Sequence, residues 1–161
     1  MSGRLRREIR QSKPFGSLEE EAVLNLQRTA SQVEQAVSET LKPFGVSSTQ
    51  YNALRILRGA GAKGLACREI AGRMIARDPD ITRLLDRLES RKLIERARSE
   101  ADRRVVVTRI TDAGLKLLSS MDGAVREFPK RALGHLGEKR LRALIKLLEA
   151  AREKQSSSEG E

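Results

Sequence analysis

Arginine is the residue type with the clearest chemistry in this sequence, and it is concentrated between residues 77 and 110. A guanidinium group binds phosphate oxygens and makes paired hydrogen bonds to the edge of guanine. Apolar residues recur at helical spacing within this segment, at Ile81, Leu84, Leu85 and Leu88. Arg83 projects from the opposite side of the same helix, with Arg87 beside it. The segment therefore predicts a helix that buries leucines and presents arginines, a pattern that solvated amphipathic helices also show.

The residues around this helix predict its start and a basic hairpin after it. Asp78 can cap the helix, and Pro79 suits the first helical position, where a missing N–H sacrifices no bond. Leu93–Arg98 and Val105–Ile110 have the composition of strands, and the charged turn Ser99–Arg104 joins them. An arginine helix followed by a basic hairpin favours contact with the two grooves of duplex DNA.

A shorter amphipathic helix precedes the arginine helix. The segment Cys67–Met74 places Ile70 and Ala71 on one face. The break at Ile75–Asp78 has about the length of the turn in a helix-turn-helix unit. In such a unit the second helix enters the major groove and the first crosses the DNA backbone. The two helices and the hairpin together predict a winged helix-turn-helix.

Four blocks of the sequence resemble the MarR family of bacterial transcriptional regulators. They are Gln50–Leu57, Ile81–Leu88, Asp102-Arg103-Arg104 and Ile110-Thr111-Asp112-Ala113-Gly114, within a resemblance that covers roughly residues 47–148. It implies a mainly α fold with a small β-hairpin wing, in which long N- and C-terminal helices dimerise. It also implies a sequence-specific transcriptional regulator, usually a repressor, that binds a palindromic double-stranded DNA operator as a homodimer and is released by a small molecule.

Helix signals at both ends of the chain divide it into five regions. Capping boxes at Ser17–Glu20 and Ser47–Gln50 start two helices, and Thr111 can cap a third, which Pro129 is expected to bend or interrupt. The apolar stripes of these helices exceed what a small central domain covers, which favours packing against a second copy over a monomer. We expect a flexible basic arm (1–16), an N-terminal dimerisation helix (17–46), the DNA-binding domain (47–110), C-terminal dimerisation helices (111–154) and a disordered tail (155–161).

Composition narrows the class of partner. The 161 residues carry a formal net charge of +10, which suits a polyanion. Three Phe, one Tyr and no Trp argue against a single-strand binder, which stacks bases on aromatic rings. No apolar run approaches the roughly 18 residues needed to cross a bilayer, and residues 1–16 lack the apolar core of a signal peptide. We therefore expect a cytoplasmic protein without membrane contact that binds duplex DNA.

No constellation of residues indicates an enzyme. The single His135 and the single Cys67 lie in different predicted elements, and one of each is too few to hold a zinc ion. We expect no catalytic site, no metal and no cofactor. Cys67 lies beside Arg68 near a helix start, which leaves a redox-sensing regulator as an alternative, although a small half-buried residue is the simpler explanation.

The arginine helix supplies the residues expected to read sequence. Arginine can bind guanine in bidentate fashion, and threonine can offer its hydroxyl or pack its methyl on thymine. The base-reading residues are expected to be Thr82, Arg83 and Arg87. Asp86 is expected to orient a neighbouring arginine, because phosphate repels its own charge. Phosphate contacts are expected from Arg68, Arg73 and Arg77.

The wing adds a second set of expected DNA contacts. The resemblance implies that Arg104 enters the minor groove and that Asp102 steers its guanidinium. Arg103 and Arg98 would then contact the DNA backbone. Which of Arg103 and Arg104 points into the groove depends on the strand register, and both remain candidates.

The resemblance also implies control by a small molecule. Many relatives release DNA when an aromatic or phenolic carboxylate binds between the dimerisation helices and the winged domain. The residues expected to approach such a site are Leu26, Ala30, Tyr51, Leu54 and Arg55, with Met121 nearby. Arg55 could pair with a carboxylate, or it could be a solvated arginine beside ordinary core residues.

Other functions fit the same basic surface. A sequence-tolerant architectural protein would coat duplex DNA with little base reading, so its specific and nonspecific affinities would be close. A dimeric helical scaffold would instead use the wing to bind an acidic protein. The basic stretch Arg4–Lys13 either follows DNA or solubilises the chain.

Overall fold

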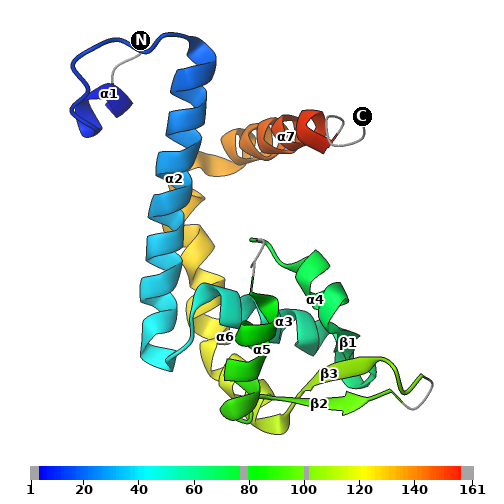
Figure 1. Ribbon diagram of the computed structural model, residues 1–161. Coiled ribbons are helices and arrows are strands. Elements are labelled where there is room, and N and C mark those ends of the chain that lie inside the picture. The colour runs from blue at the N-terminus through cyan, green and yellow to red at the C-terminus, as the bar shows by residue number, and fades with distance from the viewer. Residues whose placement is uncertain (1–3, 77–79, 100–101, 157–161) are drawn as a thin grey trace.

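Helices dominate the fold, which the computed structural model describes for residues 4–76, 80–99 and 102–156. Long helices lie at one end of the molecule, and short helices with a small sheet lie at the other (Figure 1). The expected fold class, mainly α with a small β wing, is confirmed. The helices are α1 (Arg4–Glu8), α2 (Leu18–Leu41), α3 (Ser48–Ala60), α4 (Cys67–Arg73), α5 (Ile81–Ser90), α6 (Asp112–Leu133) and α7 (Gly137–Ser156), with 3₁₀ turns at Lys42–Phe44, Gly61–Lys63 and Gly134–Leu136. The strands are β1 (Leu65–Ala66), β2 (Ile94–Arg98) and β3 (Val106–Ile110).

Side-chain caps fix the starts of the helices. Ser47 and Gln50 form the reciprocal capping box expected for α3. Ser17 caps α2 as expected, but the Glu20 carboxylate accepts from the backbone N–H of Gly16 rather than from that of Ser17. The Thr111 side chain caps α6 by accepting the backbone N–H of Gly114, as expected.

The start of α5 differs from the expectation. Its cap is Asp80, whose carboxylate accepts from the backbone N–H of Arg83 at 3.2 Å. The assignment of Asp78 as the cap is therefore wrong, because the helix begins at Ile81, and Asp78 and Pro79 themselves lie outside the described residues. An aspartate directly before the apolar periodicity caps better than one three residues ahead of it, because its oxygen must reach the N2 or N3 amide.

Three boundaries of the expected end regions also need correction. Residues 4–8 form α1 rather than an unstructured arm, and the Arg6 guanidinium closes the turn after it by donating to the carbonyls of Gln11 and Ser12. Pro129 lies inside α6, which continues to Leu133, so this proline does not interrupt the helix. The helix α7 extends to Ser156, so the tail expected from residue 155 is helical over its first two positions.

The sheet has the order β1-β3-β2, with all neighbours antiparallel. The pair β2–β3 is the expected hairpin, and Ile94 lies opposite Ile110. The strand β1 was not predicted, and it pairs Leu65 with Thr108 of β3. Gly64 precedes it with φ +63°, where a side chain would also meet the Thr108 carbonyl oxygen. The glycine thus lets the chain approach the hairpin closely enough to add a strand.

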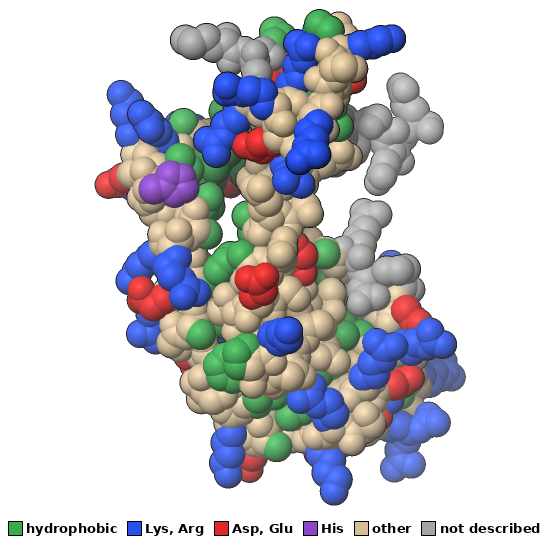
Figure 2. Space-filling model, turned by 90° about the vertical axis from the view of Figure 1, so that its left-hand side faces the viewer, with side chains coloured by type: hydrophobic (Ala, Val, Ile, Leu, Met, Phe, Trp, Pro, Cys, Tyr) green, Lys and Arg blue, Asp and Glu red, His purple; other side chains and the backbone are tan. Residues whose placement is uncertain are grey.

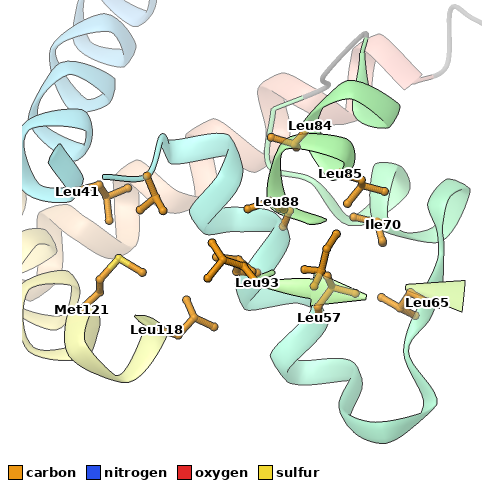
Figure 3. Close-up of a cluster of buried hydrophobic side chains, with 14 residues drawn as sticks. Leu41, Leu57, Leu65, Ile70, Leu84, Leu85, Leu88, Leu93, Leu118 and Met121 are labelled. Atoms are coloured by element: carbon orange, nitrogen blue, oxygen red, sulfur yellow. The ribbon is translucent and has the colours of Figure 1, made fainter. Parts of the chain in front are cut away.

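We call the helices α3–α5 and the sheet β1–β3 the winged part. One hydrophobic core joins it to the C-terminal end of α2 and the first half of α6 (Figure 3). Leu84, Leu85 and Leu88 of α5 are buried in it, as their helical spacing predicts. Leu118 and Met121 of α6 enter the same core and are fully buried. The other members are Leu41, Val46, Ala53, Leu54, Leu57, Leu65, Ile70, Leu93 and Ile94.

Gly114, the last residue of the Ile-Thr-x-x-Gly block, brings α6 against the residue that leads into the start of β2. A Cβ atom added to it would collide with the backbone carbonyl oxygen of Leu93 and with the Ile110 side chain. Thr111 reinforces this contact, because its hydroxyl donates to the Lys92 carbonyl at 2.7 Å. A glycine is therefore required here for packing.

The outer parts of the long helices keep large apolar side chains in contact with solvent. Leu18 of α2 is 79% exposed, and Leu147 of α7 is 70% exposed. Val23, Leu26 and Ile145 are exposed as well. In the part of the chain that the structure describes, no helix combines the length and apolar character needed to cross a membrane.

Candidate nucleic-acid interface

The helix α5 separates its apolar and basic faces as the sequence predicts. The three leucines point into the core, and Thr82, Arg83 and Arg87 are exposed on the outside. The Arg83 side chain is 72% exposed, and its Nε lies 3.5 Å from the Asp80 carboxylate. A solvent-screened pair of this kind costs little to break. The outer face of α5 can therefore turn its arginine donors toward a ligand.

Arg96 of β2 holds α5 against the hairpin. Its Nη2 lies 2.6 Å from Oδ1 of Asp86, and its Nε lies 2.9 Å from Oε2 of Glu89, which also accepts from Nη2. The hydrogen bonds from Arg96 lower the pKa of Glu89, and the two carboxylates raise the pKa of Arg96. The clamp neutralises two acidic groups of α5 and links the helix to the wing.

The expectation that Asp86 orients a neighbouring arginine applies to Arg96, which the sequence reading did not single out. The signal was present as two carboxylates three residues apart on α5, with an arginine in the following strand. This pattern becomes interpretable only when β2 is known to lie beside α5.

The wing tip is a hydrogen-bonded turn that exposes two arginines. The backbone N–H of Ser99 donates to the Val105 carbonyl at 2.8 Å. The Asp102 carboxylate accepts from the backbone N–H of Arg104 at 2.9 Å, so it supports the turn, and its expected role in steering a guanidinium stays a prediction. The Arg98 guanidinium donates to the Arg103 carbonyl at 2.8 Å.

These bonds divide the wing arginines into two groups. The Arg98 guanidinium is used within the wing, whereas Arg103 and Arg104 are exposed at the tip. Residues 100 and 101 lie outside the described residues.

The arginines expected to bind phosphate differ in what the structure says of them. Arg68 is exposed on α4. Arg73, at the end of the same helix, is also exposed, and its Nη2 lies 4.0 Å from Glu69. Arg77 lies outside the described residues. In the view of Figure 2, lysines and arginines occur over both the winged part and the terminal helices, so net charge alone does not locate the interface.

A cavity of about 330 Å³ lies between the long helices and the winged part. Tyr51 and Arg55 line it, as the sequence predicts. Leu26 and Ala30 do not line it, because the stretch of α2 that faces the cavity is the later one, from Val33 to Leu41. Leu54 and Met121 are fully buried in the core instead. The remaining lining residues are Glu34, Val37, Thr40, Ser48, Thr49, Asn52, Met74, Ile75, Ala76, Val125, Phe128 and Pro129.

The residues considered for other chemistry are far from forming a site. Cys67 is half-buried at the start of α4, and His135 is exposed in the turn before α7. Among the described residues, no cluster of His, Cys, Asp and Glu could hold a metal ion.

Comparison with known proteins explains this arrangement. Residues 46–106 match the model of the MarR family. A solved MarR transcription factor from Planctomyces limnophilus is 44% identical, covers 85% of this chain and 99% of its own, and superposes with a TM-score of 0.64. The chain belongs to the MarR family. It is therefore a non-enzymatic, DNA-binding regulator of transcription, as the MarR resemblance implied.

Two further relatives are informative. The HTH-type transcriptional repressor IacR of Pseudomonas putida is 29% identical over 124 residues, 77% of this chain and 73% of the repressor. The structure of CouR from Rhodococcus jostii RHA1 bound to p-coumaroyl-CoA is 25% identical, covers 85% of this chain and 95% of that chain, and has a TM-score of 0.70. In helix-turn-helix units the second helix is the one that enters the major groove, and α5 is the second helix of the pair α4–α5.

Proposed function

We propose that this MarR protein is a homodimeric repressor that binds a palindromic duplex operator and leaves it when a small ligand binds. The observation that carries the proposal is the outer face of α5, where Thr82, Arg83 and Arg87 are exposed beside a wing with an arginine tip. Because the target is duplex DNA, we place its action in the cytoplasm.

Each basic residue has a distinct role in this proposal. Arg83 and Arg87 bind guanine edges in the major groove, and Thr82 contacts a thymine methyl or a base acceptor. Arg68, Arg73 and Arg77 bind phosphates on either side of the groove. Arg103 and Arg104 bind the minor groove and its phosphates, while Arg98 and Asp102 hold the wing tip in shape.

Dimerisation through the terminal helices would give the operator its symmetry. The exposed apolar side chains of α2 and α7, among them Leu18 and Leu147, supply the surface that a second copy would cover. A two-fold axis then places the two α5 helices in successive major grooves, with half-sites roughly 10 bp apart.

The cavity between the long helices and the winged part is the proposed ligand site. Nine of its sixteen lining residues are apolar, and its charged members are Arg55 and Glu34. The uncharged polar members are Thr40, Ser48, Thr49, Tyr51 and Asn52. An aromatic or phenolic carboxylate matches this lining, and CouR, which was crystallised with p-coumaroyl-CoA, is a relative with an aromatic ligand. The cavity wall includes Met74, Ile75 and Ala76, which lead into α5, so a ligand there contacts the approach to that helix.

Selection of bound duplexes from a random pool tests the proposal. A palindromic consensus bound by two chains per duplex is the expected result, with specific binding at least about 1,000-fold tighter than nonspecific binding at the same salt. Recovery of duplexes without a consensus, all bound equally, would indicate an architectural protein instead. A screen for compounds that release the selected duplex then tests ligand control.

A further inference from the structure

Asn52 links the cavity to the segment that enters the recognition helix. This residue lies in the middle of α3 and is 7% exposed. Its Oδ1 accepts from the backbone N–H of Ile75 at 2.8 Å. Ile75 lies in the connection between α4 and α5, so the bond ties that connection to the centre of the winged part.

The other end of the Asn52 carboxamide is unsatisfied. Its Nδ2 is closed off from solvent and has no hydrogen-bond partner among the described residues. The orientation of the amide is fixed by Ile75, because the flipped amide would place two donors against each other. Buried amide donors are nearly always paired in folded proteins. Asn52 therefore carries an unused donor in the state that the structure describes.

Asn52 and its partner belong to the same cavity wall. Asn52, Met74, Ile75 and Ala76 all line the cavity. A ligand in the cavity thus meets both the carboxamide and the segment that the carboxamide holds. Arg55, one helical turn after Asn52, lines the same space with a cationic group.

We propose that Asn52 is the positioning residue through which a ligand releases the recognition helix. The inference rests on the proposed ligand control. Because Nδ2 is closed off, a ligand acceptor reaches it only if the side chain turns, and this turn removes Oδ1 from the Ile75 N–H. Ligand binding and the Asn52–Ile75 bond are then mutually exclusive. A ligand that breaks the Asn52–Ile75 bond therefore lowers the DNA affinity that the bond supports. By linkage, bound DNA lowers the affinity for the ligand by the same factor.

The same geometry specifies the chemistry that a ligand needs in order to break the Asn52–Ile75 bond. The ligand needs a hydrogen-bond acceptor for Nδ2, and a carboxylate also gains the charge of Arg55. A compound with the same apolar body and only an ammonium head offers no acceptor for Nδ2 and meets Arg55 with like charge. Glu34, which lines the cavity as well, attracts such a head but leaves Nδ2 unpaired. The ligand class is therefore an apolar, ring-sized molecule with a carboxylate or carboxamide oxygen.

The test uses the full-length protein, the selected operator and three probes that share one ring system. The probes are cinnamate, cinnamamide and cinnamylamine, which carry no hydrogen-bonding group other than the head. Asn52→Asp, measured at about pH 8 so that the carboxylate is ionised, keeps an acceptor for Ile75 but replaces the donor with an oxygen. Asn52→Val removes both functions. Asn25→Asp, which makes the same chemical change on the exposed surface of α2, is the matched control.

The expected results separate the variants. In the wild type and in Asn25→Asp, cinnamate and cinnamamide weaken operator binding by about tenfold or more, and cinnamylamine does not. Asn52→Asp, compared with its own operator affinity in the absence of any probe, loses this response. Asn52→Val binds the operator about tenfold more weakly without any probe and also fails to respond. Amide hydrogen exchange at Ile75 reports the bond directly, and cinnamate is expected to speed it in the wild type and in Asn25→Asp but not in the Asn52 variants.

Different failures point to different conclusions. If cinnamate releases wild type and Asn52→Asp equally, or releases the wild type without faster exchange at Ile75, Asn52 is not the link and ligand control stands. If Asn52→Val does not fold, the Asn52→Asp response and the exchange at Ile75 in the wild type decide alone. If no acceptor probe releases the wild type, both the inference and the proposed ligand control are overturned, while operator binding by α5 is unaffected.

Discussion

The winged part and the terminal helices of this MarR protein differ in how completely each buries its own apolar surface. The leucines on the inner face of α5 are almost fully buried within one chain. Leu18 of α2 and Leu147 of α7 are 79% and 70% exposed. Both regions use the same amphipathic helical pattern, so the pattern alone does not reveal where the covering surface comes from.

This difference separates two tasks. The winged part buries its apolar side chains within one chain, and Asn52 and Thr108 are the polar residues buried with them among the described residues. The terminal helices leave large apolar side chains exposed, a surface suited to association with a second copy. The cavity lies where the two regions meet, so a ligand there contacts both the association helices and the approach to the recognition helix.

The largest expected effect is on the free energy of unfolding, from a substitution at a tight contact between α6 and the winged part. Gly114→Ala forces a Cβ atom against the Leu93 carbonyl, where neither backbone can move freely. We expect the free energy of unfolding to fall by about 3 kcal/mol, measured by urea denaturation, because overpacking a tight contact is destabilising. Gly123→Ala is the control in the same helix, since an added Cβ there has nothing within 4 Å.

The control should change stability in the opposite direction, by about 1 kcal/mol, because alanine favours the helix over glycine. Equal stability of the two variants would show that α6 does not approach β2 as closely as described.

A slightly smaller effect is expected on dimerisation, from a substitution on the exposed apolar surface of the terminal helices. Leu147→Glu places a charge on the exposed apolar surface of α7. If this surface is covered by a second copy, the variant dimer should be weaker, because each copy carries the change. The dimer dissociation constant measured by sedimentation should rise about 100-fold, near 2.7 kcal/mol. Ser119→Glu, an exposed position of α6, is the control and should leave the dimer intact.

Leu147→Glu should leave the unfolding midpoint of the winged part unchanged when wild type and variant are compared as monomers. A dimer unaffected by this variant would place the two-fold interface elsewhere.

The two regions also differ in how far the sequence predicts them. The helix α5 and the hairpin were predictable because their periodicities are strong and their partners are near in the chain. The strand β1, Leu65–Ala66, is too short to show alternation and exists only through pairing with β3. Leu26 and Ala30 were misplaced because an apolar stripe gives the face of a helix but not the element that the face meets. The role of Arg96 likewise required knowing that β2 lies beside α5.

A third comparison lies within the DNA-binding surface, between a base-reading and a backbone-binding arginine. Arg83→Ala should cost about 2 kcal/mol of operator affinity and relax the preference at one base pair. Arg103→Ala should lower affinity for all duplexes alike and reduce the slope of log affinity against log salt by about one. Duplex binding titrated over salt, with operator and scrambled duplexes, measures both.

Each variant is the control for the other, because both remove one exposed arginine. Identical losses on operator and scrambled duplexes for Arg83→Ala would remove it from base reading.

The smallest expected effect concerns the clamp that joins α5 to the wing. The hydrogen bond from Arg96 lowers the pKa of Glu89 below the ordinary 4.5. A lowered carboxyl pKa means that the folded protein binds fewer protons than the unfolded chain. Its stabilisation is therefore complete above the ordinary pKa and is lost as pH falls through the lowered one. Since the Glu89 side chain is 37% exposed, we expect only about 0.5 kcal/mol.

Glu89→Gln should accordingly be less stable than the wild type at neutral pH, and the difference should shrink as pH falls below 4.5. Urea denaturation of both proteins at neutral and acidic pH measures it. Glu95→Gln, an exposed neighbour on β2, should match the wild type at either pH. A difference that grows on acidification would mean that Arg96 does not stabilise the charged form of Glu89. A clamp this weak adds little to the core, so its main consequence is geometric: it sets the direction of α5 relative to the wing.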